Sequence, residues 1–168
     1  MNSQTEKQPI STRQIKERLR RYTDLLREIE NQRERLDCLM ETYGDPSSSD
    51  LSGTPRPKGG VSDPTANAAE RITDLREKIQ RKEAQEKIER AALEDLTEHM
   101  DDPDERLVIQ LKYIDQVEWD DITFRLFGNL RDYTEKFEGY QRRTFRIHGR
   151  ALLNLARAES GVNDSKCQ

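Results

Sequence analysis

Apolar residues recur every seven positions between Thr12 and Tyr43, and this spacing restricts the segment to a long amphipathic helix. A second apolar series, offset by four residues, is interrupted at Arg33. Two such series make one narrow stripe that buries against a partner helix. Only 32% of the 168 residues are hydrophobic and 37% are charged, which argues against a large enzyme-type core. We therefore predict an all-α fold. The first series is Ile15, Tyr22, Ile29, Leu36 and Tyr43, and the second is Leu19, Leu26 and Met40.

A second long helix is predicted after a polar interruption. Gly44 ends the first pattern, and the Gly-, Pro- and Ser-rich stretch that follows predicts a flexible loop over 44–62. Asp63-Pro64 is typical of a helix start, because Asp caps free amides and proline fits the first turn. Residues 12–100 are thus expected to form a long antiparallel coiled-coil hairpin. Its second stripe contains Ala68, Ile72, Leu75, Ile79, Leu93, Leu96 and Met100.

The middle of that second stripe is polar, with Lys82, Glu86 and Glu89. These residues either pair with Arg18, Arg21 or Arg33 of the first helix or leave the hairpin loosely packed there. Three apolar residues, Leu25, Leu39 and Ile88, lie outside the stripe. They favour a homodimer through the hairpin over a monomeric spacer.

Residues 101–160 contain the start and stop signals of three shorter helices. Residues 1–11 and 161–168 are predicted to be disordered. Asp102-Pro103 repeats the start signal, with Glu105 at the capping-box position. The expected helices span Pro103 to Ile114, Glu118 to Gly128 and Tyr140 to Glu159. The connecting segment 129–139 is long enough for a helical turn or two, which Tyr133 and Phe137 would attach to the core.

The last helix contains five arginines and no acidic residue between Tyr140 and Arg157. At about 100° per residue, Arg143, Arg146, Arg150 and Arg157 share one face, opposite a face with Thr144, His148, Ala151, Leu152 and Leu155. A solvated helix face normally mixes both charge signs, so this pattern indicates a surface for phosphate. Two preceding helices make the arrangement similar to a helix-turn-helix module, whose reading helix contacts double-stranded DNA from its N-terminal end. The predicted DNA-binding residues are Gln141, Arg142, Arg143, Arg146 and Arg150.

Asp101 to Asp121 contains eight acidic residues against Arg106 and Lys112. Much of this charge is explained by the first turns of two helices, where the helix dipole favours carboxylates. The alternative is that the acidic side meets a basic protein surface, and RNA polymerase is the candidate partner.

Three motifs, Leu111-Lys112-Tyr113, Trp119-Asp120-Asp121-Ile122 and Arg143 to Leu152, resemble the DNA-binding region 4 of bacterial sigma factors. More narrowly, residues 38–158 look like the small phage-encoded transcription regulators of the ArpU type. The resemblance implies a sigma-like helix-turn-helix, promoter recognition at phage genes, typically late ones, and a cytoplasmic location in a bacterial host cell. The long segment between Gly128 and Tyr140 departs from the usual short turn.

Two other functions stay open. A phage DNA-packaging component similar to small terminase subunits would also combine a helix-turn-helix with an oligomerising helical part, but it would form a closed ring. A coiled-coil adaptor without nucleic acid would use the arginines for a carboxylate-rich partner instead.

An enzyme is the least expected class. His99 and His148 have no ligand partners at metal spacing, Cys38 and Cys167 are read as free thiols, and no phosphate-binding glycine loop follows a strand. His148 falls on the core side of its helix and is interpreted as a packed, hydrogen-bonded side chain. We expect no cofactor, no metal and no catalytic residue. No segment has the apolar length of a membrane span, so we expect no membrane partner.

Overall fold

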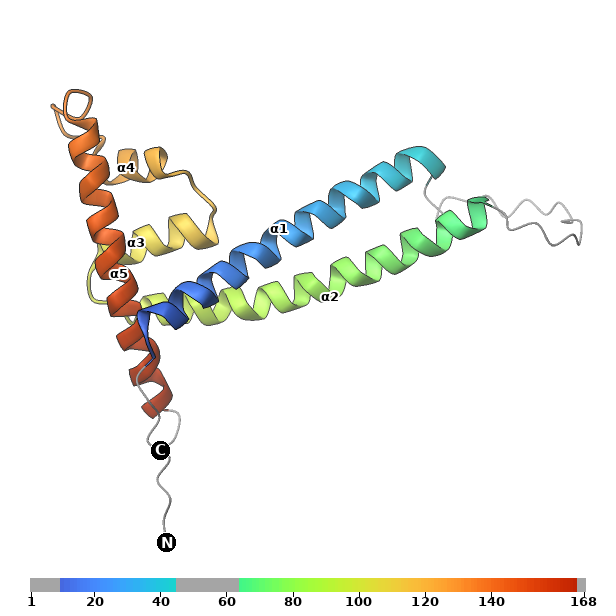
Figure 1. The fold of residues 1–168 in the computed structure, drawn as a ribbon, viewed down its shortest axis with the longest axis horizontal. Coiled ribbons are helices and arrows are strands. Elements are labelled where there is room, and N and C mark those ends of the chain that lie inside the picture. Colours follow the sequence, from blue (N-terminus) through green and yellow to red (C-terminus); the bar gives the residue numbers. More distant parts are fainter. Residues whose placement is uncertain (1–9, 45–63, 166–168) are drawn as a thin grey trace, which may run out of the picture. The chain divides into compact units, whose positions relative to one another are not determined.

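The chain is all-helical over the residues that its structure, a computed structural model, describes, namely 10–44 and 64–165 (Figure 1). Parts of the predicted loop and of the predicted disordered ends, at 1–9, 45–63 and 166–168, lie outside these residues. No strand occurs in the described ranges, and the all-α prediction is confirmed. The elements are α1 (Thr12–Tyr43), α2 (Pro64–Glu98), α3 (Pro103–Ile109), a π-helix (Gln110–Ile114), α4 (Trp119–Phe127) and α5 (Phe137–Ser165).

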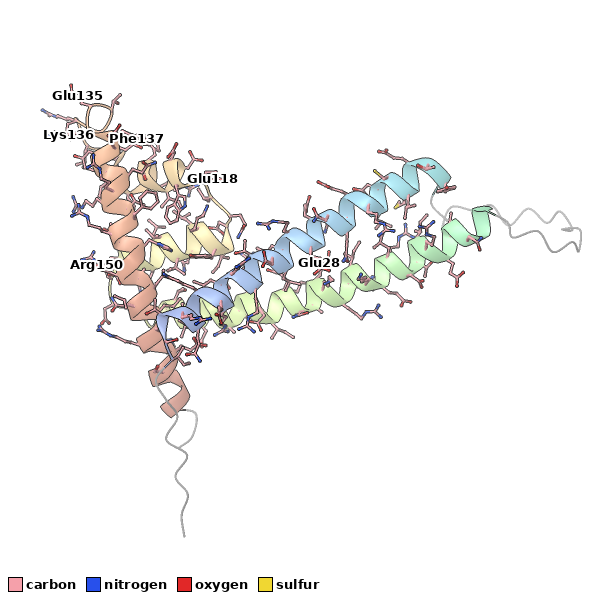
Figure 2. All side chains as sticks on the ribbon, in the orientation of Figure 1. Glu28, Glu118, Glu135, Lys136, Phe137 and Arg150 are labelled. Carbon is pink, nitrogen blue, oxygen red and sulfur yellow. The ribbon has the colours of Figure 1, made fainter. Side chains whose placement is uncertain are left out.

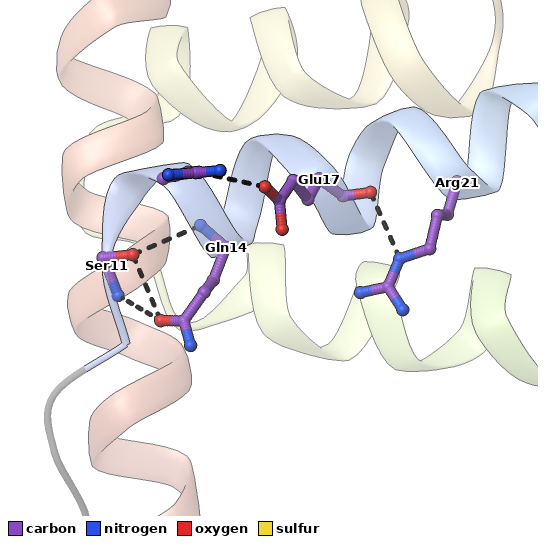
Figure 3. A network of polar contacts seen from close by, with 5 residues as sticks. Ser11, Gln14, Glu17 and Arg21 are labelled. Atoms are coloured by element: carbon purple, nitrogen blue, oxygen red, sulfur yellow. Dashed lines mark hydrogen bonds and ion pairs between the residues drawn. The ribbon is translucent and has the colours of Figure 1, made fainter.

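Helix α1 begins and ends where local chemistry dictates. Figure 3 shows a capping box, in which the Ser11 amide donates to Gln14 Oε1 (2.7 Å) and the Gln14 amide donates to Ser11 Oγ (3.3 Å). At the other end Gly44 adopts a φ of 79°, and its amide donates to the Met40 carbonyl (2.8 Å). A left-handed residue at this place favours glycine, so the predicted stop at Gly44 is confirmed.

Two compact units make up the chain: Met1–Asp24 with Ile88–Gln168, and Leu25–Lys87. The predicted domain boundary between residues 100 and 101 stays a prediction, because a compact unit need not be an independently folding domain.

In the unit Leu25–Lys87, α1 and α2 pack in opposite directions. Lys82 Nζ lies 2.7 Å from Glu28 Oε2, and Arg76 contacts Met40. Later residues of α1 therefore contact earlier residues of α2. The polar middle of the α2 stripe therefore does pair with α1. Lys82 pairs with Glu28, which differs from the arginine partners considered from sequence.

The apolar stripe of this unit is confirmed in part. Ile29, Ile72 and Ile79 are buried, as expected, whereas Tyr43, the last member of the first predicted series, is 47% exposed. At the predicted interruption, Arg33 is exposed and pairs with Glu83 (2.7 Å), while the neighbouring Gln32 is buried. A straight helix repeats every 3.6 residues, so a heptad stripe drifts around it, and the second series shifts by one residue here.

In the other unit, the start of α1 joins the end of α2 and the second half of α5. Ile15 and Leu19 are fully buried, and so is Leu93 of α2. Arg18 connects these elements through ion pairs with Glu89 (3.5 Å) and Glu159 (2.6 Å).

Helices α3, α4 and α5 enclose a second part of that unit's core. Its buried members are Val108, Leu111, Ile122, Phe127 and Ile147. Asp102 caps α3 by accepting from the amides of Asp104 (2.9 Å) and Glu105 (3.3 Å), as the start signal predicts.

The predicted helix from Pro103 to Ile114 is not α-helical throughout. It changes to a π-helix at Gln110, and the Asp115 amide donates to the Gln110 carbonyl five residues earlier (3.0 Å). The wider turn still leaves Leu111 and Ile114 buried.

The segment between α4 and α5 forms turns and is attached to the core by aromatic rings. Tyr133 stacks on Tyr140 (ring centroids 6.0 Å apart) and contacts Phe137 edge to face (5.7 Å), which supports the predicted role of Tyr133. Helix α5 starts at Phe137, three residues before the predicted start, and extends to Ser165 instead of ending at Glu159. Gly128 is required here, since a Cβ would lie 2.5 Å from the Phe124 carbonyl oxygen.

Candidate nucleic-acid interface

Helix α5 separates its side chains into two faces. Thr144, Ile147, Ala151, Leu152 and Leu155 are buried, and α5 packs on α3 and α4. The hydroxyl groups of Thr144 and Thr123 are hydrogen-bonded in the interior (3.1 Å). The apolar face was predicted correctly, and it fixes which side of α5 is directed to solvent.

The solvent side of α5 carries a shallow groove, which we call the arginine groove. Its lining residues are Arg143, Arg146, Gly149, Arg150 and Leu153. They recur at three- and four-residue spacing, so they form one stripe along the helix. Three of the five predicted DNA-binding residues are therefore brought together.

The position of Arg150 is fixed by an ion pair with a residue of α3. Its Nε lies 3.5 Å from Glu105 Oε1, and Asn154 Nδ2 donates to Glu105 Oε2 (2.6 Å). Glu105 is 3% exposed, so its charge needs these partners. The sequence pattern placed Glu105 in a capping box, but only its backbone amide takes part in the cap. Its side chain instead fixes the orientation of α5.

Arg143 and Arg146 are the most available cations of the groove. The guanidinium of Arg143 lies over the Phe127 ring, 4.9 Å from its centroid, which orients the side chain without neutralising it. Arg146 is exposed, and no ion pair joins it to a carboxylate among the described residues. Both groups are free to donate to an anion.

Arg142 and Gln141 do not line the groove. Arg142 pairs with Glu138 one turn earlier on its own helix (3.6 Å), and both side chains are largely exposed. Gln141 Nε2 donates to Asp120 Oδ1 in the first turn of α4 (2.8 Å). The structure thus directs Gln141 toward α4, about 140° or more around the helix from the groove arginines.

Leu153 and Gly149 were missed as groove residues. Leu153 is 51% exposed although it is apolar. The signal was present in the sequence, because residues 143, 146, 150 and 153 follow helical spacing, but only the charged members were selected.

His148 borders the core side of α5. Its Nε2 is hydrogen-bonded to the Tyr113 hydroxyl (3.0 Å), and its ring contacts Trp119 edge to face (5.0 Å). Burial, helped by the charges of Lys16 and Lys112, lowers the pKa of His148 below its ordinary value. These contacts agree with the predicted packed histidine.

Within the described ranges, no group of three or more His, Cys, Asp or Glu side chains is placed to hold a metal ion. In the same residues, no helix has the length and hydropathy needed to cross a bilayer. Comparison of the chain with known protein families, with curated proteins and with solved structures gives no match.

Proposed function

We propose that this protein is a sequence-specific DNA-binding transcription regulator that contacts double-stranded DNA through the arginine groove of α5. The observation that carries the proposal is the groove itself: Arg143, Arg146 and Arg150 line one exposed surface on a helix whose opposite face is buried. Between Tyr140 and Arg157 this helix has no carboxylate to compete with phosphate.

Arginine chemistry supports this assignment. A guanidinium donates two parallel hydrogen bonds to a phosphate or to the N7 and O6 atoms of guanine, whereas a lysine offers only a point charge. Fixing Arg150 through Glu105 and Arg143 over Phe127 lowers the entropy that these long side chains lose on binding.

In the finer fold that we infer, α1 and α2 form a coiled-coil hairpin, and α4 with α5 forms a sigma-like helix-turn-helix. The close packing of α4 on α5 through Thr123 and Thr144 supports the second part. The segment 128–136 replaces the usual short turn, and Tyr133 holds it to the core. Promoter recognition at phage genes would follow from this arrangement.

Partners other than DNA belong to the same proposal. Asp121, in the first turn of α4, and Glu118, the residue before that helix, are exposed, and their negative charge offers RNA polymerase an acidic surface. Ile88 is 71% exposed, and it supports self-association through the hairpin.

The test is a binding measurement with purified full-length protein. A duplex selected from a random library supplies the cognate site, and fluorescence anisotropy gives its affinity. Arg143→Ala and Arg146→Ala should each weaken cognate binding by about 1–3 kcal/mol. The affinity should also fall with salt, with a log–log slope of about −3 to −4 if three to four phosphates are contacted.

Arg13→Ala is the matched control, because Arg13 is an exposed arginine on α1 that forms an ion pair with Glu17 one turn later (3.1 Å). Its affinity should equal that of the wild type. Unchanged binding in both groove variants, or a flat salt response, contradicts the proposal and favours the adaptor function. Sedimentation as a closed ring of many subunits favours the packaging function instead.

A further inference from the structure

Gly149 lies in the middle of α5 without a structural reason to be glycine. A Cβ built at this position meets no atom within 4 Å, and the residue has ordinary helical backbone. Gly128 is different, because a Cβ there would collide with Phe124. A glycine inside a helix is less favourable than alanine, so its place in α5 has a cost that no contact within the described residues offsets.

The neighbours of Gly149 on α5 are the side chains of the arginine groove. It lines the arginine groove between Arg146 and Arg150, and Leu153 follows one turn later. Around the helix, the apolar members Gly149 and Leu153 lie on one side of the groove, and the three arginines lie beside them on the other. An apolar strip beside a cationic strip matches one strand of a nucleic acid, which presents apolar sugars beside anionic phosphates.

We propose that Gly149 is the point at which the sugar–phosphate backbone of one DNA strand lies directly against α5. Arg146 and Arg150, about 6 Å apart along the helix axis, would hold phosphates on the two sides of that point. Leu153 would contact a deoxyribose. The inference rests on the proposed DNA-binding function and specifies which part of the duplex enters the groove.

The absence of a side chain is what makes this approach possible. A methyl group at position 149 projects into the groove and keeps the strand away from the helix surface. The two arginines then reach their phosphates at longer distance, and charge-assisted hydrogen bonds weaken steeply with distance. The effect is independent of sequence, since phosphates are alike at every site.

Gly149→Ala is the test, since protein stability and DNA affinity should change in opposite directions. The unfolding temperature should rise by about 2–4 °C, because alanine favours the helix and meets no clash. The affinity for DNA should fall by about tenfold, equally on the cognate duplex and on random duplexes.

Gly139→Ala is the matched control. Gly139 lies on the same face of α5, and its Cβ also meets no atom within 4 Å. It is outside the groove and next to Glu138, near the end of α5 where Figure 2 shows Glu135 and Lys136. This variant should gain stability and keep the affinity of the wild type.

The outcomes separate this inference from the function on which it rests. Unchanged affinity in Gly149→Ala, together with weakened Arg146→Ala, overturns the close approach at Gly149 and leaves DNA binding intact. A loss confined to the cognate duplex overturns the backbone contact in favour of a base contact. An equal loss in Gly139→Ala overturns the special position of Gly149. Failure of the wild type to bind any duplex overturns both proposals.

Discussion

The α1–α2 pair of residues 25–87 and the solvent face of α5 both contain many arginines, but they differ in how far these arginines are paired with carboxylates. Arg33 in the helix pair lies 2.7 Å from Glu83 and 3.8 Å from Glu30, and the hydrogen bond to Glu83 raises its pKa above the ordinary value. Arg146 on α5 has no ion pair with the described carboxylates. The comparison shows that composition alone does not identify a binding surface, because the most available arginine, Arg146, is one that lacks an ion pair with a described carboxylate.

The two regions also differ in how much of their apolar surface is enclosed. Ile122 of α4 is fully buried, whereas Leu39 of α1 lines an open groove with Leu75. Ile122→Ala should therefore cost about 3–4 kcal/mol of unfolding free energy, and Leu39→Ala about 1 kcal/mol. Urea unfolding of the full chain measures both values. Equal costs would show that the helix pair is as tightly packed as the α3–α5 core.

Buried and exposed ion pairs give a second contrast. Glu105→Gln should destabilise the protein by about 2 kcal/mol, because it weakens the contacts that the buried Glu105 carboxylate makes with Arg150 and Asn154. Glu83→Gln removes a more exposed partner of Arg33, and it should cost less than about 0.5 kcal/mol. Raising the salt concentration should reduce the second effect but not the first. A salt-sensitive cost at Glu105 would contradict its burial.

A substitution of Gln32 is expected to raise the free energy of unfolding. Its Oε1 is buried and has no hydrogen-bond partner, and its Nε2 donates to Glu28 Oε1 at 3.2 Å. Gln32→Leu should stabilise the helix pair by about 1 kcal/mol, because an unsatisfied polar atom is removed from the stripe. Thermal unfolding measures the gain. A loss of stability would show that the glutamine is needed for the pairing of α1 with α2.

The smallest expected effect is a dependence of stability on pH that arises at His148. Its pKa is lowered in the folded protein, chiefly by burial, so the folded state favours the neutral ring. This contribution is complete above the unfolded pKa of about 6.5 and is lost as the pH falls below that value toward the folded pKa. His148→Gln should remove this part of the difference between urea midpoints at about pH 5 and about pH 7.5. An unchanged pH profile in the variant would assign the dependence to other groups.

Several helix ends could be predicted from sequence because their signals are local. Gly44, Asp102 and Gly128 act through bonds to residues within four positions, so no knowledge of distant packing is needed. The apolar stripe of α2 was equally accessible, since its buried members follow one helical period. The Ser11–Gln14 capping box at the start of α1 is a local signal of the same kind.

Other features depend on contacts between residues far apart in the chain. Glu105 was interpreted as part of a helix cap, but its side chain contacts Arg150 and Asn154, which are more than forty positions away. Gln141 was grouped with the arginines by its place near the start of a helix, yet its amide donates to Asp120. No local sequence pattern distinguishes these alternatives. Glu105 fits both a helix cap and a long-range contact, and Gln141 fits both a DNA contact and a contact with α4.

The sequence by itself determined that the chain is helical, where several of its helices begin or end, and that α5 has an apolar face opposite a cationic one. These properties follow from periodicity and from bonds between near neighbours. Only the tertiary structure decided which arginines remain available, because availability depends on whether a distant carboxylate or ring reaches the guanidinium. The same is true of Gly149, whose significance depends on the empty space around it, which is a property of packing and not of residue type.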